Sequence, residues 1–238
     1  FKSYEISVIS IIVISLITPI VLAANNWDDH DRSDKYTARS MARKYLDSCA
    51  ENAILFTIGD NDTFALWYAQ EIEGYRTDVR VVNTSLFQTD WYIDQMKRKA
   101  YESDPIPSQL THEHYKYGTN DYLIVESVFK DTLEIKQVLN FISNNPKANY
   151  KYELQRQGVD ISQVRSQDLN AKYFPTKHLR LPINKENALK HGIVKPKDAD
   201  LIVPHIDIEI NGGAVYKNRL LMLDIVANNE WKRPIYFT

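Results

Sequence analysis

The stretch Ile54-Leu55-Phe56-Thr57-Ile58-Gly59-Asp60-Asn61-Asp62 decides the fold of this chain. An apolar, partly β-branched run stops at a glycine, and three short polar side chains lead into an aromatic-rich segment that begins at Thr63. This pattern predicts a buried strand, a tight turn and the N-terminus of a helix. In open α/β sheets, a turn of this kind lies at the carboxyl ends of the strands, where ligands usually bind.

A second unit of the same kind follows directly. The predicted helix from Thr63 to Glu73 is followed by a strand from Val79 to Asn83, and a polar loop from Thr84 to Thr89 leads into a helix that begins at Asp90. Strand–helix–strand units are almost always parallel and right-handed, so the two polar loops should lie side by side at one edge of a sheet. The side chains expected in that crevice are those of Asp60, Asn61, Asp62, Thr84, Ser85, Gln88 and Asp90, with Trp67 and Trp91 close by.

Residue chemistry leaves the role of the Gly59–Asp62 loop open. Its carboxylate and amide oxygens could bind a divalent cation. Asp62 or Thr63 could equally cap the helix, and Asp60 or Asn61 suits a turn. The loop has neither the GxGxxG fingerprint nor the lysine of a phosphate-binding loop, and the chain has no GxSxG elbow. Nucleotide binding of those types therefore has no support.

Composition limits the classes of function. Lys plus Arg total 29 and Asp plus Glu 31, which gives a net charge of −2, so no general field attracts nucleic acid. The single cysteine, Cys49, cannot form an internal disulfide and lacks the companions of a zinc site. Hydrophobic residues make up 44% of the chain, which is ample material for a core.

The N-terminal segment is long enough to cross a membrane. Residues 6–24 carry no charge and are dominated by Ile, Val and Leu. A helix of that length measures roughly 28 Å, close to the thickness of a bilayer core. We therefore expect residues 1–25 to form a transmembrane helix. Val21-Leu22-Ala23 also resembles the cleavage site of a signal peptide, and a buried helix is a further alternative. The two leading interpretations place residues 26–238 outside the cytoplasm.

Three other groups contain possible metal ligands. Asp28, Asp29, His30 and Asp31, followed by Arg32, either bind a cation or form a solvated linker. His112-Glu113-His114 lacks the spacing and the third ligand of a zinc site. His205, Asp207 and Glu209 alternate with isoleucines, so they either bind metal or form the wet face of an edge strand. We predict no cofactor in this chain, although a divalent cation is chemically feasible.

The rest of the chain completes the predicted fold. Helices are expected over 131–144, 185–191 and 216–228, strands over 179–183, 201–210 and from 233 onward, and a polar surface insertion over about 147–177. Together these elements predict an α/β domain over residues 26–238, with three layers, a mainly parallel sheet and helices on both faces, as in Rossmann-like folds. The strand-like run at the end of the chain indicates that this domain continues beyond residue 238.

Three stretches, taken together, resemble a known family. They are Asn26–Arg32, Asn52–Trp67 and Arg80–Gln95, and the closing segment Lys232–Thr238 fits as well. The chain resembles the C-terminal part of the multi-pass membrane proteins known as domain of unknown function 2723. That family looks like the GT-C-type glycosyltransferases and is related to transmembrane protein 260 and the protein O-mannosyltransferases.

This resemblance implies a fragment of a cell-membrane glycosyltransferase that uses a polyprenyl-phosphate sugar, with its periplasmic domain binding an acceptor protein or glycan. The catalytic acidic residue would lie in a part of the protein outside this chain. Two alternatives stay open, a non-catalytic envelope binding or assembly module and a metal-dependent hydrolase that uses the acidic loop. The candidate ligand-binding residues are Asp28, Asp29, His30, Asp31, Arg32, Asp60, Asn61, Asp62, Trp67, Asp90 and Trp91.

Overall fold

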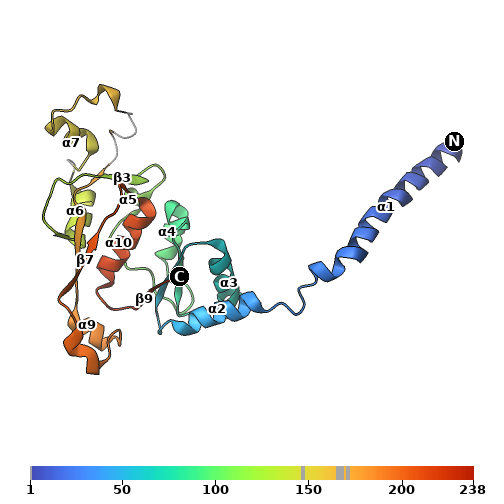
Figure 1. Ribbon diagram of the computed structural model, residues 1–238, viewed down its shortest axis with the longest axis horizontal. Coiled ribbons are helices and arrows are strands. Elements are labelled where there is room, and N and C mark those ends of the chain that lie inside the picture. Colours follow the sequence, from blue (N-terminus) through green and yellow to red (C-terminus); the bar gives the residue numbers. More distant parts are fainter. Residues whose placement is uncertain (1, 146–147, 165–168, 170–171) are drawn as a thin grey trace. The chain divides into compact units, whose positions relative to one another are not determined.

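The computed structural model describes residues 2–145, 148–164, 169 and 172–238 (Figure 1). The chain divides into two compact units, residues 1–40 and 41–238. In the first unit, helix α1 (Lys2–His30) includes one segment that is long and apolar enough to cross a membrane, and none of that segment is buried.

Helix α1 continues five residues past the predicted boundary at residue 25. The side-chain amides of Asn25 and Asn26 donate to the carbonyl oxygens of Val21 and Leu22, at 2.9 and 2.8 Å. These bonds fold the polar side chains back onto the preceding turn, so the acidic segment begins as helix rather than as a free linker.

The strands of the second unit form three separate three-stranded sheets among the described residues. The first sheet has the order β2-β1-β9 and is parallel throughout, with β1 at Ile54–Thr57, β2 at Arg80–Asn83 and β9 at Ile235–Phe237. The second has the order β5-β3-β8 and is mixed, with β3 at Tyr122–Val125, β5 at Tyr173–Phe174 and β8 at Ala214–Tyr216. The third has the order β4-β6-β7 and is also mixed, with β4 at Leu133–Glu134, β6 at His178–Pro182 and β7 at His205–Glu209.

Short helices connect and cover these sheets. The α-helices after α1 are α2 (Thr37–Ser48), α3 (Asp60–Glu71), α4 (Asp90–Met96), α5 (His112–Tyr115), α6 (Ile135–Asn144), α7 (Tyr150–Arg156), α9 (Lys185–Lys190) and α10 (Lys217–Asn229). The 3₁₀ helices are η1 (Leu86–Gln88), η2 (Ile161–Gln163) and η3 (Pro196–Leu201). Helix α3 starts at Asp60, three residues earlier than predicted, and α4 ends at Met96, earlier than the predicted end near Tyr101.

The central strand of the first sheet, β1, is buried on both faces because its alternate residues enter different hydrophobic clusters. Ile54 and Phe56 belong to a large cluster with residues of α4, α6 and α10. Leu55 belongs to a smaller cluster with residues of α2 and α3. A strand that is buried on both faces has apolar residues at consecutive positions, and the run that begins at Ile54 has this pattern.

The α/β class is confirmed, but the predicted Rossmann-like three-layer parallel sheet is not present among the described residues, where no further strand joins the outer edge of β2. Two side chains occupy that edge: Gln70 donates to the carbonyl of Val79 at 2.8 Å, and the amide of Asn83 donates to the hydroxyl of Tyr92 at 2.8 Å. The later strands instead pair among themselves, partly antiparallel.

The segment from residue 147 to 177, predicted to be a polar surface insertion, contributes to the interior. Tyr173 and Phe174 of β5 are both buried, and so are Glu153 and Leu154 of α7. Residues 147, 165–168, 170 and 171 of that segment lie outside the described residues.

Candidate functional site

The carboxyl ends of β1 and β2 lie side by side, as the sequence predicted. Parallel pairing places Thr57 opposite Asn83. The Thr84 hydroxyl donates to the Thr57 carbonyl at 2.9 Å, and the Ser85 hydroxyl donates to the Ile58 carbonyl at 2.9 Å. The two polar loops are therefore joined by direct hydrogen bonds.

A buried network of hydroxyl and amide groups holds this edge together. The Thr63 hydroxyl is 2.6 Å from the Thr57 hydroxyl, donates to the Gly59 carbonyl at 2.6 Å and accepts from the Asn83 side-chain amide at 2.9 Å. Thr57, Thr63 and Asn83 are all buried. Sequence reasoning missed the role of Thr63 and Asn83, although a polar residue next to a buried strand was a usable signal.

The acidic residues of the predicted loop form the first turn of α3, where Asp60 and Asn61 are exposed. Asp62 accepts a hydrogen bond from the Thr238 hydroxyl at 2.8 Å and one from the Thr63 amide at 3.0 Å. Burial raises the pKa of Asp62, but these hydrogen bonds outweigh it, so the net pKa is lowered. Asp62 thus links α3 to the residue that follows β9.

Asp90 is also held by backbone groups. Its carboxylate accepts from the amide of Trp91 at 2.8 Å and from the amide of Tyr117 at 3.0 Å, and these bonds lower its pKa. Among the described residues, no three His, Cys, Asp or Glu side chains come together in a way that could hold a metal ion. The structure therefore gives no support to a cation at Asp60–Asp62 or at Asp90.

The other possible metal ligands have local partners. Asp31 accepts from the amide and the hydroxyl of Ser33, at 2.8 and 2.6 Å, within the first unit together with Asp28, Asp29, His30 and Arg32. The ring of His114 is 2.9 Å from the Thr111 hydroxyl and caps α5. Asp207 accepts both hydrogen bonds of the Arg180 guanidinium across β6 and β7, at 2.7 and 2.8 Å.

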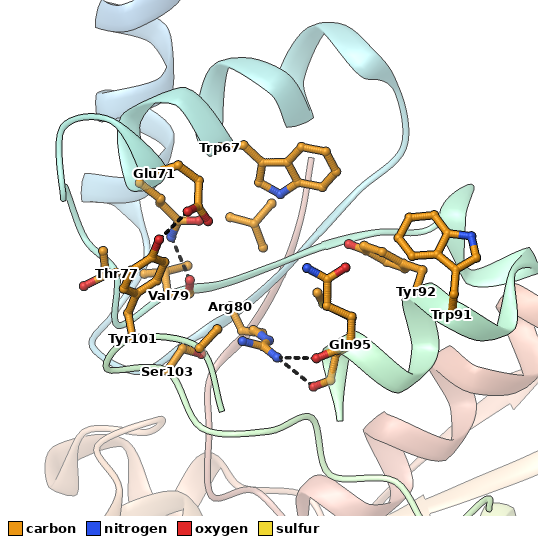
Figure 2. A pocket seen from close by; sticks show the side chains of 14 residues that line it. Trp67, Glu71, Thr77, Val79, Arg80, Trp91, Tyr92, Gln95, Tyr101 and Ser103 are labelled. Atoms are coloured by element: carbon orange, nitrogen blue, oxygen red, sulfur yellow. Dashed lines mark hydrogen bonds between the residues drawn. The ribbon is translucent and has the colours of Figure 1, made fainter. Parts of the chain in front are cut away.

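The two candidate tryptophans both line a cavity of about 350 Å³ beside the edge of β2. Trp67 projects from α3, Trp91 from α4, and the Gln95 side chain lies between Arg80 and Tyr92 (Figure 2). Asp60, Asn61, Asp62 and Asp90 do not line this cavity. The structure thus separates the aromatic candidates from the acidic ones, which the sequence had placed in one crevice.

Among the described residues, Val81 of β2 lines the cavity and its backbone amide and carbonyl have no hydrogen-bond partner on the outer side of the strand. Arg80 donates its amide to Ala53 at 2.8 Å and Thr84 donates to Thr57 at 2.8 Å, so alternate residues of the strand face β1. Because the direction of the N–H and C=O groups alternates along a strand, those of Val81 face the other way.

The backbone groups on either side of Val81 along this edge already have hydrogen-bond partners. The Val79 carbonyl already accepts from Gln70, and the Asn83 amide already donates to Tyr92. Val81 is also one of the residues that line the cavity. Its amide and carbonyl can therefore pair with one extended residue of a ligand.

Arg80 lies at the same edge and is 3% exposed. Its Nη2 atom donates to the carbonyl oxygens of Gln95 at 3.3 Å, Met96 at 2.8 Å and Arg98. Its Nε atom is buried and has no hydrogen-bond partner among the residues that the structure describes. Burial lowers the pKa of the guanidinium. Sequence reasoning missed this residue, although an arginine inside an apolar buried strand was a signal.

A second polar pair lines the cavity. The Tyr101 hydroxyl donates to the carboxylate of Glu71, and this bond raises the pKa of Tyr101 (Figure 2). Both residues are exposed. The cavity therefore combines aromatic walls, an open strand edge, a buried cation and an exposed carboxylate, which suits a ligand with several polar groups.

Comparison with known proteins gives a consistent family. Residues 38–238 match the family model described as TMEM260-associated domain 2. A stretch of 74 residues, 31% of this chain, is 32% identical to the mouse (Mus musculus) protein named Protein O-mannosyl-transferase TMEM260, and the chain spans about a tenth of the length of that relative. No solved structure matches the chain.

Proposed function

The chain belongs to the family described as TMEM260-associated domain 2, and we propose that residues 41–238 bind the acceptor polypeptide of a membrane-bound protein O-mannosyltransferase. The mouse relative carries that activity in its name, and α1 supplies a segment suited to anchoring the chain in a membrane. The complete protein would take mannose from a polyprenyl-phosphate donor with GT-C-type chemistry, and its catalytic residues would lie outside this chain. The acceptor-binding unit would lie on the periplasmic side.

The open edge of β2 carries this proposal. An extended peptide can add to a strand edge when both an N–H and a C=O are available, and the side chains beside the edge then determine which peptides fit. Val81 supplies both groups, and Trp67 and Trp91 line the same cavity. A cavity of about 350 Å³ is of a size to hold one or two residues of such a peptide.

The first test measures peptide binding to the chain in detergent micelles by isothermal titration calorimetry. We compare an eight-residue peptide that contains serine and threonine with the same peptide carrying an N-methyl group on its central residue. N-methylation removes one backbone donor, so it should weaken binding by about threefold to tenfold if the peptide pairs with Val81. Equal affinity for the two peptides would contradict strand pairing.

A tryptophan pair provides the matched control. Trp91 and Trp27 are 56% and 73% exposed, but only Trp91 lines the cavity. Trp91→Ala should weaken peptide binding by about tenfold or more, as expected for an aromatic anchor at an interface. Trp27→Ala should leave the affinity unchanged. An equal loss in both variants would place the binding site elsewhere.

The activity of the complete protein needs a separate experiment. Deletion of its gene should remove hexoses from serine and threonine residues of envelope proteins, and mass spectrometry of those proteins detects the loss. An unchanged glycan profile, combined with peptide binding by the chain, would instead favour a non-catalytic binding or assembly module.

A further inference from the structure

We infer that the cavity beside β2 contains an oxyanion subsite, in which Arg80 binds a carboxylate or phosphate group of the ligand. The inference rests on the proposed function, which identifies the ligand as a polypeptide. It adds that the group of the ligand bound at this position is negatively charged. It follows from the hydrogen bonds that Arg80 makes, from those that it lacks and from the charges around it.

The hydrogen bonds of Arg80 are incomplete for so buried a group. A guanidinium has five N–H donors, and buried donors almost always have partners. Among the described residues, the hydrogen bonds of Arg80 use Nη2 alone, while Nε is fully enclosed and unpaired. Arg80 also lines the cavity, so a rotation of its guanidinium would bring this unpaired donor to an acceptor that enters the cavity.

Two other arginines show that this pattern is not general in the chain. Arg233 is 7% exposed and uses all three of its nitrogens, with Nε donating to the Asn52 carbonyl at 2.7 Å and Nη1 to the Asp104 carbonyl at 3.1 Å. Arg76 also uses all three nitrogens, two of them on the carboxylate of Asp78. Arg80 is the most buried of the three arginines and has the fewest nitrogens paired.

The charge around Arg80 favours an anion. Within the part of the chain that the structure describes, neither Arg80 nor Arg233 forms an ion pair with a carboxylate. Burial lowers the pKa of Arg233 to about 10, and the charge of Arg80 adds to this effect while Asp104 opposes it. Two guanidinium groups therefore influence each other in a desolvated region, where an incoming anion would offset both charges.

The arrangement also gives the ligand a direction. Ser103, which is 2% exposed and lines the same cavity as Arg80, accepts from Arg233 at 3.4 Å. The Glu71 carboxylate, held by Tyr101, lies apart from Arg80 in the same cavity (Figure 2). An anionic group should therefore occupy the Arg80 side, while donors of the ligand face Glu71.

An oxyanion of this kind could come from two sources, an acidic side chain of the acceptor polypeptide or a free phosphate. The first experiment uses the wild-type chain in detergent micelles and follows the arginine Nε–H signals by NMR, with Arg80→Lys identifying the signal of Arg80. Inorganic phosphate or acetate should shift the Arg80 Nε–H signal in a saturable way. The signal of Arg76 should stay in place because its nitrogens are already paired.

The second experiment compares two peptides that differ only in a glutamate or a glutamine beside the serine. The glutamate peptide should bind the wild-type chain about tenfold more tightly, because hydrogen bonds to charged groups are the stronger class. This preference should vanish in Arg80→Met and persist in Arg219→Met, which removes an exposed arginine outside the cavity. Phosphate should compete with the glutamate peptide more strongly than with the glutamine peptide.

The outcomes separate this inference from the proposed function. If both peptides bind equally and no oxyanion shifts the Arg80 signal, the subsite is overturned while peptide binding stands. If neither peptide binds but phosphate shifts the signal, the subsite stands with phosphate as its ligand and the acceptor role fails. If no peptide and no oxyanion binds, both fall. The wild-type measurements decide these outcomes even if Arg80→Met does not fold.

Discussion

Thr63 holds the carboxyl ends of β1 and β2 through a single hydroxyl group, which contacts Thr57, Gly59 and Asn83. Thr63→Val keeps the shape of the side chain but leaves the buried groups of Thr57 and Asn83 without this partner. We expect the free energy of unfolding in urea to fall by about 1–3 kcal/mol. Thr63→Ser keeps the hydroxyl and should lose less than about 1 kcal/mol. A smaller loss in Thr63→Val than in Thr63→Ser would show that the methyl group, and not the network, matters.

Asp224 gives a prediction about pH. It is fully buried on α10 and accepts from the Ser108 hydroxyl and from the backbone amides of Gln109 and Leu110, the last two at 3.2 and 3.4 Å. Burial raises its pKa above 3.8, and the hydrogen bonds from residues 108–110 offset only part of this effect. The folded state therefore holds the proton of this group more tightly than the unfolded state does.

The sign of the effect follows from that difference. The contribution of Asp224 to stability is complete below the unfolded pKa and is lost as the pH rises through the folded pKa. Asp224→Asn cannot titrate, so the free energy of unfolding of the wild type relative to this variant should decrease as the pH rises above the ordinary aspartate pKa. Urea unfolding at several pH values measures it, and a constant difference would contradict the raised pKa.

At the scale of single elements, local patterns predicted some strands closely. The predicted strands Ile54–Ile58 and Val79–Asn83 differ from β1 and β2 by one residue each, because both are apolar runs that end at turn residues. The division into three sheets could not be predicted in this way. It depends on Gln70 and Tyr92 occupying the edge of β2, and these contacts leave no periodic pattern in the sequence.

The candidate site shows the same division between local and distant information. Trp67 and Trp91 were predicted to lie near each other because parallel strand ends meet, and both line the cavity. The acidic residues were expected in the same crevice, but Asp62 and Asp90 bind nearby backbone or hydroxyl groups instead. Arg80 was not predicted, since its role depends on the carbonyl oxygens at the end of α4.

Strands β6 and β7 allow a prediction about an exposed ion pair. Arg180 and Asp207 are paired in register, and the guanidinium donates two hydrogen bonds to the carboxylate. Their side chains are 37% and 50% exposed, so solvent screens the interaction. A double-mutant cycle with Arg180→Gln and Asp207→Asn should give a coupling close to the error of urea unfolding, because solvent screens exposed ion pairs. A large coupling would require a buried or metal-bound pair.

At the scale of the whole molecule, the apolar α1 and the folded unit of residues 41–238 have opposite solvent preferences. Residues of α1 such as Ile11, Ile14 and Ile20 are each more than 60% exposed, which is unfavourable in water but suits a lipid environment. The second unit instead has its own buried clusters. The molecule therefore combines a membrane-compatible segment with a domain that packs in water.

The last prediction concerns the attachment of the protein to a membrane and the side on which its second unit lies. If α1 is a retained anchor, the protein expressed from its native gene should stay in the membrane fraction after extraction with alkaline carbonate, because about nineteen apolar residues bind a bilayer too strongly to be washed off. Under the proposed function, the second unit lies outside the cytoplasm. In a Cys49→Ala background, Ser33→Cys should then react with a membrane-impermeant maleimide added to intact spheroplasts. Labelling only after lysis would place the unit in the cytoplasm, and a soluble protein whose N-terminus begins near Asn25 would instead identify α1 as a cleaved signal peptide.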